Sequence, residues 1–270
     1  MNNQKDYFST NGFSAKDYSN QHIEDAGGKG LSFIGCNFSY CFLERCYFHN
    51  AKFERCSFIG TRISYCNFRS STFSNCDFSY ATFETTIISE NEIIQNLPYE
   101  PNKRRDLIRS LRMNSSAMGN QAATNGLLSL ELKASAQHHY NVYRSSSSYY
   151  NKYSFRDKVS SFFSYIGLQL EDKIWGYGIS PIRLFKWILL IITISGIIIG
   201  IGESGDLIVK SNLPKNIFDG LSNSTLAILD LGLVNSTIIE RHRTVFGILV
   251  AARTTILGLF ITVIYRRYAR

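Results

Sequence analysis

The sequence predicts a mixed fold in which a square β-helix, a cytoplasmic helical hairpin and a two-helix transmembrane domain with a re-entrant loop follow one another along 270 residues. Three observations predict it: a five-residue apolar period, a stretch of helical spacing that carries most of the positive charge, and two long apolar spans in the last third. The predicted domains are an N-terminal lead-in or cap (1–30), the β-helix (31–90), a basic hairpin and linker (91–160), an amphipathic pre-membrane segment (161–186) and the two-span domain (187–270), whose loop is 216–234.

The five-residue period begins at Leu31, and the residues before it show no clear period, so a loose lead-in is expected there. Every fifth position then holds a large apolar residue: Phe33, Phe38, Leu43, Phe48, Phe53, Phe58, Ile63, Phe68, Phe73, Phe78, Phe83 and Ile88. Two positions before each of them, with only Leu31 larger, stands a small residue: Cys36, Cys41, Cys46, Ala51, Cys56, Thr61, Cys66, Ser71, Cys76, Ala81 and Thr86.

This period matches neither an α-helix nor a flat strand, whose side chains repeat every 3.6 and 2.0 residues. A square coil with one repeat on each side explains it, because both residues of a repeat then point inward and residues 20 apart lie in register. All 6 cysteines hold the small inward position, which predicts packing residues, and no paired C-x₂-C spacing of a zinc site occurs. The pattern resembles the pentapeptide-repeat family, which implies a right-handed quadrilateral β-helix.

The outward positions of these repeats are nearly balanced in charge. Five basic residues (Arg45, Lys52, Arg55, Arg62 and Arg69) face four acidic ones (Glu44, Glu54, Asp77 and Glu84). Some pentapeptide-repeat proteins are acidic mimics of DNA that inhibit topoisomerases, and this balance argues against such a role. The outward tyrosines Tyr40, Tyr65 and Tyr80 are expected to provide contact area for neighbouring chains.

Helical spacing returns after Pro98 and Pro101, where Leu107, Ile108 and Leu111 are followed by a turn at Gly119-Asn120 and a second helix from Gln121 to about Tyr143. Positions 101–160 hold ten basic and three acidic residues, which is most of the net charge of +8. This concentration of charge predicts a site for an anionic ligand, nucleotide or oligonucleotide. The phosphate donors would be Arg104, Arg105, Arg109 and Arg112. The alternative is a helix near anionic lipid headgroups or a solvated face.

Two further features of this region carry expectations. His138 and His139 lack a partner at metal-ligand spacing and are expected at the surface, so no metal site is predicted. The stretch RSSSSYYNKYS, residues 144–154, has the composition of a flexible linker. An amphipathic segment follows it and leads to the first apolar span.

The two apolar spans predict a multi-pass membrane protein. Trp187–Gly202 has no charged residue, and Thr244–Tyr265 has only Arg253. A helix of roughly 20 residues crosses a hydrocarbon core of ~30 Å, so each span is long enough. Basic residues flank the start of the first span and follow the second, which predicts that both termini are cytoplasmic, at the cell inner membrane.

A second resemblance involves the junctions of these spans. The stretch W-G-Y-G-I-S-P-I-R before the first span and L-G-L-F-I-T-V-I-Y-R-R at the end of the second are similar to pentapeptide-repeat proteins that carry a two-span, potassium-channel-like pore domain. DLIRSLR…MGNQAATNGLLSLELKA is similar to the hairpin that links the two parts in that family. The resemblance implies four subunits around a pore, and two helices with one loop cannot enclose a water path alone.

The loop between the spans departs from the potassium filter T-V-G-Y-G, whose carbonyls replace the ion's hydration shell. The corresponding stretch is A-I-L-D-L-G-L-V-N, residues 227–235, so potassium selectivity is not expected. The candidate pore-loop residues are Leu229, Asp230, Leu231, Gly232 and Val234, which with Leu233 could form a hydrophobic constriction and a carboxylate ring. Arg253, near the middle of its span, is expected either to pair with Asp230 or to line the pore.

These observations predict a homotetrameric ion channel in which the β-helix and hairpin sense a ligand. The chain also resembles the channel effectors of Hailong-type antiphage defence systems, which implies a nucleotidyltransferase partner and restraint by a single-stranded oligonucleotide. The alternatives are a constitutive ion-homeostasis channel and a non-conducting membrane scaffold. No P-loop, G-x-S-x-G or H-E-x-x-H motif is present, so neither an enzyme nor a cofactor is expected.

Overall fold

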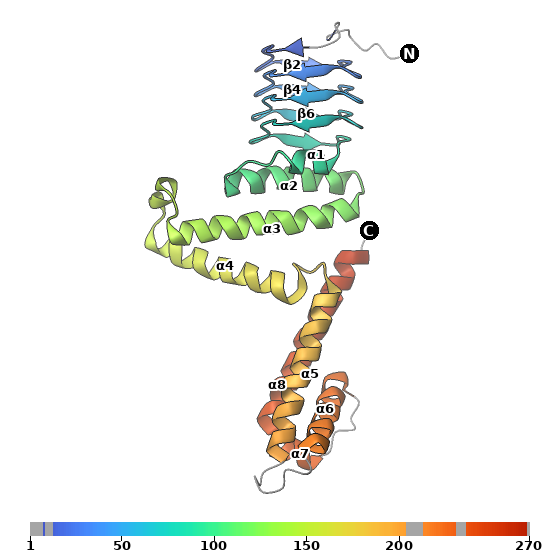
Figure 1. Ribbon diagram of the computed structural model, residues 1–270, viewed down its shortest axis with the longest axis vertical. Helices are drawn as coiled ribbons and strands as arrows, with labels where there is room; N and C mark the ends of the chain where they lie inside the picture. The colour runs from blue at the N-terminus through green and yellow to red at the C-terminus, as the bar shows by residue number, and fades with distance from the viewer. Residues whose placement is uncertain (1–7, 9–12, 204–212, 231–235, 269–270) are drawn as a thin grey trace. The chain divides into compact units, whose positions relative to one another are not determined.

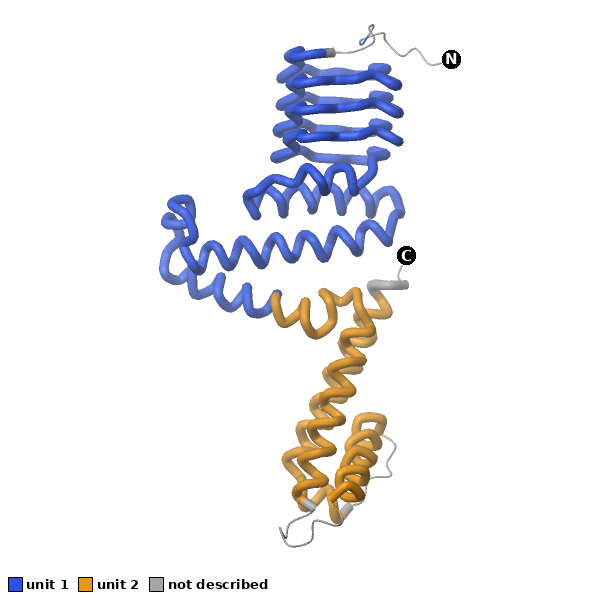
Figure 2. The backbone as a smooth tube through the Cα atoms, in the orientation of Figure 1, with its two compact units in different colours: residues 1–168 blue, residues 169–270 orange. Residues whose placement is uncertain are grey.

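The structure is a computed structural model that describes residue 8 and residues 13–203, 213–230 and 236–268. The chain divides into two compact units, residues 1–168 and 169–270 (Figure 2).

The first unit begins with a β-solenoid whose strands form two parallel four-stranded sheets, β1-β3-β5-β7 and β2-β4-β6-β8 (Figure 1). The strands are β1 Phe13–Ser14, β2 His22–Glu24, β3 Ser32–Ile34, β4 Phe42–Glu44, β5 Lys52–Glu54, β6 Arg62–Ser64, β7 Thr72–Ser74 and β8 Thr82–Glu84. Paired residues are 20 apart, as in Phe33↔Phe53, and single bridges such as Asn37↔Ser57 complete the other sides. The predicted square coil with four repeats per turn is therefore confirmed.

The inward side chains stack in columns along the solenoid. Ring centroids of Phe33 and Phe53 are 4.8 Å apart with nearly parallel planes, and Phe58 and Phe78 are 4.9 Å apart. Most of the small inward residues that carry a hydroxyl or thiol donate a hydrogen bond to a carbonyl 23 residues earlier, as Thr61 Oγ1 does to Phe38 O at 2.7 Å. The cysteines are buried and form no disulfide with one another, and burial raises the pKa of the Cys36 and Cys41 thiols. They are packing residues, as predicted.

The predicted lead-in at 1–30 is wrong from residue 13 onward, because β1 and β2 already belong to the first coil. Phe13 pairs with Phe33, and the Tyr18 ring stacks on Phe38 at 5.0 Å. The five-residue spacing continues through these positions, but Gly28 interrupts it where an apolar residue is expected. A Cβ at Gly28 would lie 2.5 Å from the Phe48 ring, so this ring occupies the space that an apolar side chain at position 28 would need.

Each corner of the solenoid uses a residue with positive φ, which is unfavourable for side chains other than glycine. Thr85 is β-branched and has φ of 45°. Thr85→Gly should therefore raise the free energy of unfolding by about 1 kcal/mol. The matched control is Thr72→Gly in β7, where the backbone is extended and glycine should lower stability. Chemical denaturation followed by circular dichroism measures both, and equal losses would contradict the strain.

Two helices close the last coil, α1 Glu90–Ile94 and α2 Pro101–Ala117 (Figure 1). Side chains of α2 and of the loop after α1 accept hydrogen bonds from amides of the last coil: Asn96 Oδ1 from Cys76 N at 2.9 Å, Ser110 Oγ from Phe83 N and Asn114 Oδ1 from Thr86 N, both at 2.8 Å. Ile93, Leu107, Ile108 and Leu111 are buried and extend the solenoid core. The sheet edge is thus covered, which prevents pairing with another chain.

Helix α3, Gln121–Arg144, packs along α2 and begins at Asn120, whose side chain accepts from Ala123 N at 3.1 Å. The turn between the helices contains Gly119 with φ of 73°, where the sequence places it. Helix α4, Phe155–Trp175, starts before residue 161, so the predicted boundary between 160 and 161 is wrong. A reciprocal cap between Ser154 and Asp157 begins α4 earlier.

The connection between α3 and α4 differs from the predicted flexible linker. It contains a 3₁₀ helix, η1 Ser148–Lys152, and Tyr150 is buried. The Tyr150 ring lies 5.8 Å from that of His138, so His138 and its neighbour His139 are half-buried and not the surface residues that the sequence predicts. Burial lowers the pKa of both histidines and favours their neutral form.

The second unit contains α5 Pro181–Glu203, α6 Leu213–Leu229, α7 Ser236–Arg241 and α8 Arg243–Tyr268. The first apolar helix begins at Pro181, so residues 182–186 add about a turn to the span that starts at Trp187. Arg183 and Trp187 bond back to the end of α4. Arg183 Nη1 donates to Asp172 Oδ1 at 2.7 Å, and Trp187 Nε1 donates to Lys173 O at 3.1 Å. Gly176, Tyr177 and Gly178 all have positive φ and make the sharp turn between the helices.

Candidate functional site

The predicted basic face of α2 is used largely for contacts within the first unit. Arg109 Nε donates to Glu131 Oε1 at 2.8 Å, and Arg112 Nε donates to Glu131 Oε2 at 2.7 Å. The Glu131 side chain on α3 is 8% exposed, against 49% and 28% for the two arginines. These ion pairs clamp α2 to α3 through the Nε atoms, and among the described residues no acceptor is bound to the Nη groups of Arg109 and Arg112.

Arg104 and Arg105 lie nearer to the start of α2. Arg104 donates from Nε to Pro98 O and from Nη2 to Tyr99 O, both at 3.0 Å. Arg105 pairs with the neighbouring Asp106 at 3.0 Å, an exposed contact of small energetic value. The four arginines therefore do not form one common anion cradle: two brace Glu131, one braces the loop before α2, and Arg105 is held by the weakest contact.

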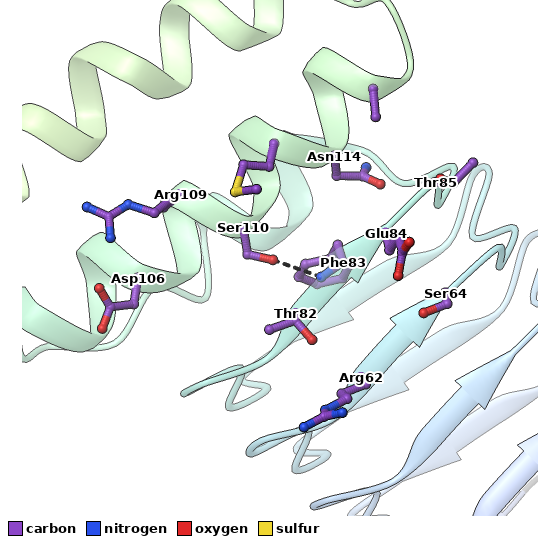
Figure 3. A pocket seen from close by; sticks show the side chains of 12 residues that line it. Arg62, Ser64, Thr82, Phe83, Glu84, Thr85, Asp106, Arg109, Ser110 and Asn114 are labelled. Carbon is purple, nitrogen blue, oxygen red and sulfur yellow. Dashed lines mark hydrogen bonds between the residues drawn. The ribbon is translucent and has the colours of Figure 1, made fainter.

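Two cavities adjoin these arginines. One of about 540 Å³ lies between α2 and strands β6 and β8, with Arg62, Glu84, Asp106 and Arg109 at its charged edges and Phe83 and Met113 in its wall (Figure 3). The other, of about 460 Å³, lies between the start of α2 and the end of α3 and is lined by polar groups, including Arg104, Gln137 and Asn141. Both are open at the surface and are large enough for a small ligand.

The pore-loop residues are placed in part. Leu229 ends α6 with its side chain exposed, and Asp230 follows with φ of 58°. Leu231, Gly232, Leu233 and Val234 lie outside the described residues. Arg253 of α8 forms an ion pair with Asp230, which is the first of the two predicted arrangements.

A close contact between α5 and α6 was not predicted from the sequence. A Cβ added to Gly220 of α6 would collide with the carbonyl oxygen of Gly196, and one at Gly200 of α5 would lie 2.6 Å from Ile217 Cα. The helices touch at the backbone, as helices in membranes do where small residues meet. The sequence does contain a signal for this contact, because Gly196 and Gly200 are spaced i, i+4 and so lie on one face of α5. Glu131, the other missed residue, could have been found as the lone acid of α3.

The comparisons with known proteins concern the solenoid. The family described as pentapeptide repeats matches in eight copies, over residues 30–64 and 51–89. No curated protein matches the chain. A similar solved structure is a pentapeptide repeat protein from the Arabidopsis thaliana thylakoid lumen, with 15% identity and a TM-score of 0.24 over 32% of this chain and 74% of that one. Another is QnrB1, a plasmid-mediated fluoroquinolone resistance protein, with 17% identity and a TM-score of 0.14 over 27% and 56% of the two chains.

Proposed function

We propose that this chain, in which eight pentapeptide repeats form a β-solenoid, is an oligomeric membrane ion channel gated by an anionic ligand. The solenoid and the α2–α3 hairpin would be its cytoplasmic sensor, and the helices of the second unit would form the pore. The observation that carries the proposal is a pair of long apolar helices whose side chains are mostly exposed.

Two helices are long and apolar enough to cross a bilayer. They are Pro181–Gly202, with a mean hydropathy of 2.4, and Arg243–Tyr265, with 2.0. Only 28% and 11% of the residues in their most apolar windows are buried, whereas the core helix of a soluble protein would bury most of them. Large apolar side chains such as Leu189, Ile248 and Leu257 are more than half exposed and need lipid or further copies of the chain around them.

The position of α6 supports a re-entrant loop. This helix has 17 residues and packs against both α5 and α8. Its contact with α5 centres on Gly196 and Gly200, near the end of α5 that leads to α6. A helix seated in this way, with its last residue next to Asp230, is the arrangement a pore loop needs. Because one such unit cannot enclose water, several copies are required, and we propose four.

The ion pair between Asp230 and Arg253 compensates the charge that Arg253 brings into the apolar helix α8. An uncompensated charge near the bilayer centre costs at least about 2.5 kcal/mol, and four arginines facing a pore would repel cations. Pairing with Asp230 neutralises the guanidinium within the same chain. The exposed carboxylate, 71% accessible, still presents oxygen to a cation path. We propose that the exposed carboxylate favours the conduction of cations.

The basic residues of the hairpin support an anionic ligand. Arg105 and Arg109 lie on α2. Arg104 lines the polar cavity between the start of α2 and the end of α3. The proposed ligand is a nucleotide or a short single-stranded oligonucleotide, made by a partner nucleotidyltransferase in an antiphage defence system of the inner membrane. Such a ligand would hold the channel closed or open it, since an ungated pore would dissipate the membrane potential.

The test is ion flux through liposomes that contain the full chain. Asp230→Asn and Arg253→Gln should each lower the ion flux at least several-fold or shift the reversal potential. Each substitution leaves the other charge without its partner. The exchange Asp230→Arg/Arg253→Asp should recover part of the loss. Asp219→Asn on the exposed side of α6 is the control and should behave as the wild type. Absence of flux under all conditions would leave a non-conducting scaffold.

The ligand is tested in the same assay by adding short single-stranded oligonucleotides. They should change the flux through the wild type, and Arg105→Glu should abolish the response without changing the basal flux. Arg69→Glu, an exposed charge reversal on the solenoid, is the control and should leave the response intact. Flux that no oligonucleotide alters would indicate a constitutive channel.

A further inference from the structure

Helix α4 has two different faces within the first unit. One face packs on α3: the rings of Phe162 and Tyr143 are 5.0 Å apart, those of Tyr165 and Tyr140 are 5.3 Å apart, and Ser161 Oγ lies 3.4 Å from His139 Nδ1. The other face carries Phe155, Val159, Phe163 and Ile166, which are 81%, 39%, 67% and 37% exposed. These four residues are called the α4 stripe.

The stripe is continuous along the helix. At about 100° per residue, positions 155, 159, 163 and 166 fall within an arc of roughly 80°. Two phenylalanines exposed to this extent on one helix face form an apolar surface that water solvates poorly. The stripe is therefore an interaction surface, and its neighbours decide what it contacts.

Basic residues lie close to the stripe. Arg156 is exposed at one edge of the arc, Lys158 is half-buried on the side that packs on α3, and Lys152 and Arg144 precede them. Asp157 is the acidic residue of this segment, and its carboxylate accepts from Ser154 N at 2.9 Å and Ser154 Oγ at 2.7 Å. These bonds lower the pKa of Asp157 and occupy its carboxylate in capping α4. The segment offers cations to a partner.

An apolar cavity lies beside the stripe. It has a volume of about 240 Å³ and is lined by Tyr143, Phe155, Lys158, Val159 and Phe162. Its walls are aromatic and aliphatic, and Lys158 is the charged group on its lining. A slot of this kind accepts hydrocarbon and places an anionic group near the lysine ammonium.

We propose that the α4 stripe binds the surface of an anionic phospholipid bilayer, with Phe155 and Phe163 inserted among the acyl chains and Arg156 and Lys158 on the phosphates. An exposed apolar arc with basic edges is the pattern of a helix that lies in the membrane interface. In the chain, α4 leads directly into α5, whose composition suits a bilayer. The inference rests on the proposed membrane function and adds a second lipid contact, made by the sensor unit.

The experiment uses single-tryptophan versions of the full chain, because the sequence has only Trp175 and Trp187. Phe163→Trp, with both native tryptophans changed to Phe, reports on the stripe. The chain with Trp175→Phe alone keeps Trp187 as a reference for the apolar helix. Tyr99→Trp, at a side chain that is 89% exposed and away from the stripe, is the matched control in the tryptophan-free background.

Each version is reconstituted in phosphatidylglycerol vesicles with brominated acyl chains. We expect the tryptophan at 163 to emit at short wavelength and to be quenched at least two-fold, as Trp187 is, while the tryptophan at 99 is not quenched. Lys158→Glu with Arg156→Glu, or replacement by phosphatidylcholine, should reduce the quenching at 163 and leave that at 187 unchanged.

Three results would overturn the proposal. Emission at 163 that matches the exposed control, with Trp187 still quenched, would show that the stripe faces water. Short-wavelength emission without quenching would show that it packs on another copy of the chain. Loss of quenching at Trp187 as well would mean that the proposed membrane function has failed, which distinguishes that failure from failure of the stripe alone.

Discussion

Gly220→Ala is expected to destabilise the second unit and abolish ion flux, although alanine is the better helix former. The added Cβ would collide with the carbonyl oxygen of Gly196 and lie 2.9 Å from Gly200 N, so α5 and α6 would have to separate. Overpacking against a rigid backbone costs about 3 kcal/mol, more than the roughly 1 kcal/mol that alanine gains in helix propensity. Thermal unfolding in detergent and liposome flux measure the two effects.

The matched control for this substitution is Gly247→Ala on α8. A Cβ there would meet nothing within 4 Å, so only the gain in helix propensity remains, and stability should be unchanged or slightly higher. The opposite signs of the two Gly→Ala changes test the contact itself. If Gly220→Ala behaved as Gly247→Ala does, α6 would not be seated on α5 as described, and the re-entrant loop would lose its support.

Removing both arginines that bind Glu131 is expected to unfold the α2–α3 hairpin locally. In Arg109→Met/Arg112→Met the Glu131 carboxylate, 8% exposed, would lose both partners at 2.8 and 2.7 Å. Leaving a buried charge unpaired costs about 3–5 kcal/mol, whereas replacing the whole group by apolar residues is often neutral. Adding Glu131→Leu to the double variant should therefore restore most of the lost stability. Hydrogen exchange of the α3 amides measures both.

The control for the clamp is the exposed pair Lys103–Glu100, at 3.2 Å on the same helix. Lys103→Met should lower stability by less than about 1 kcal/mol, because water already solvates both charges. If Arg109→Met/Arg112→Met lost no more stability than this control, the structural clamp would be contradicted, and Arg109 and Arg112 would again be candidates for the ligand site. The comparison therefore decides which arginines remain available for an anion.

The β-solenoid could be predicted from the sequence because its period is local. Inward residues such as Phe53 recur at a fixed spacing, and a coil of four repeats converts that spacing directly into the register observed between Phe33 and Phe53. The prediction failed for the first coil, where Gly28 stands at an apolar position. Only the packed structure shows that the Phe48 ring fills the space that a side chain at 28 would need.

The apolar helices could likewise be predicted, because length and composition are properties of the sequence. The seat of α6 could not, since it depends on glycines 20 and 24 positions apart in the chain meeting at the backbone. The partner of Arg253 was one of two predicted arrangements, and the position of Asp230 after α6 decides between them. The side chains of the rest of the loop, from 231 to 235, are outside the described residues.

The sequence by itself determined the solenoid repeat, the two apolar helices and the concentration of positive charge near α2, because each is carried by spacing or composition within one segment. The tertiary structure decided which charges are available. Arg109 and Arg112 look equivalent to Arg105 along the helix, yet Glu131 reaches both of them from α3, whereas Arg105 pairs with its neighbour Asp106. The physical reason is that an ion pair depends on distance in space, which spacing along one helix does not contain.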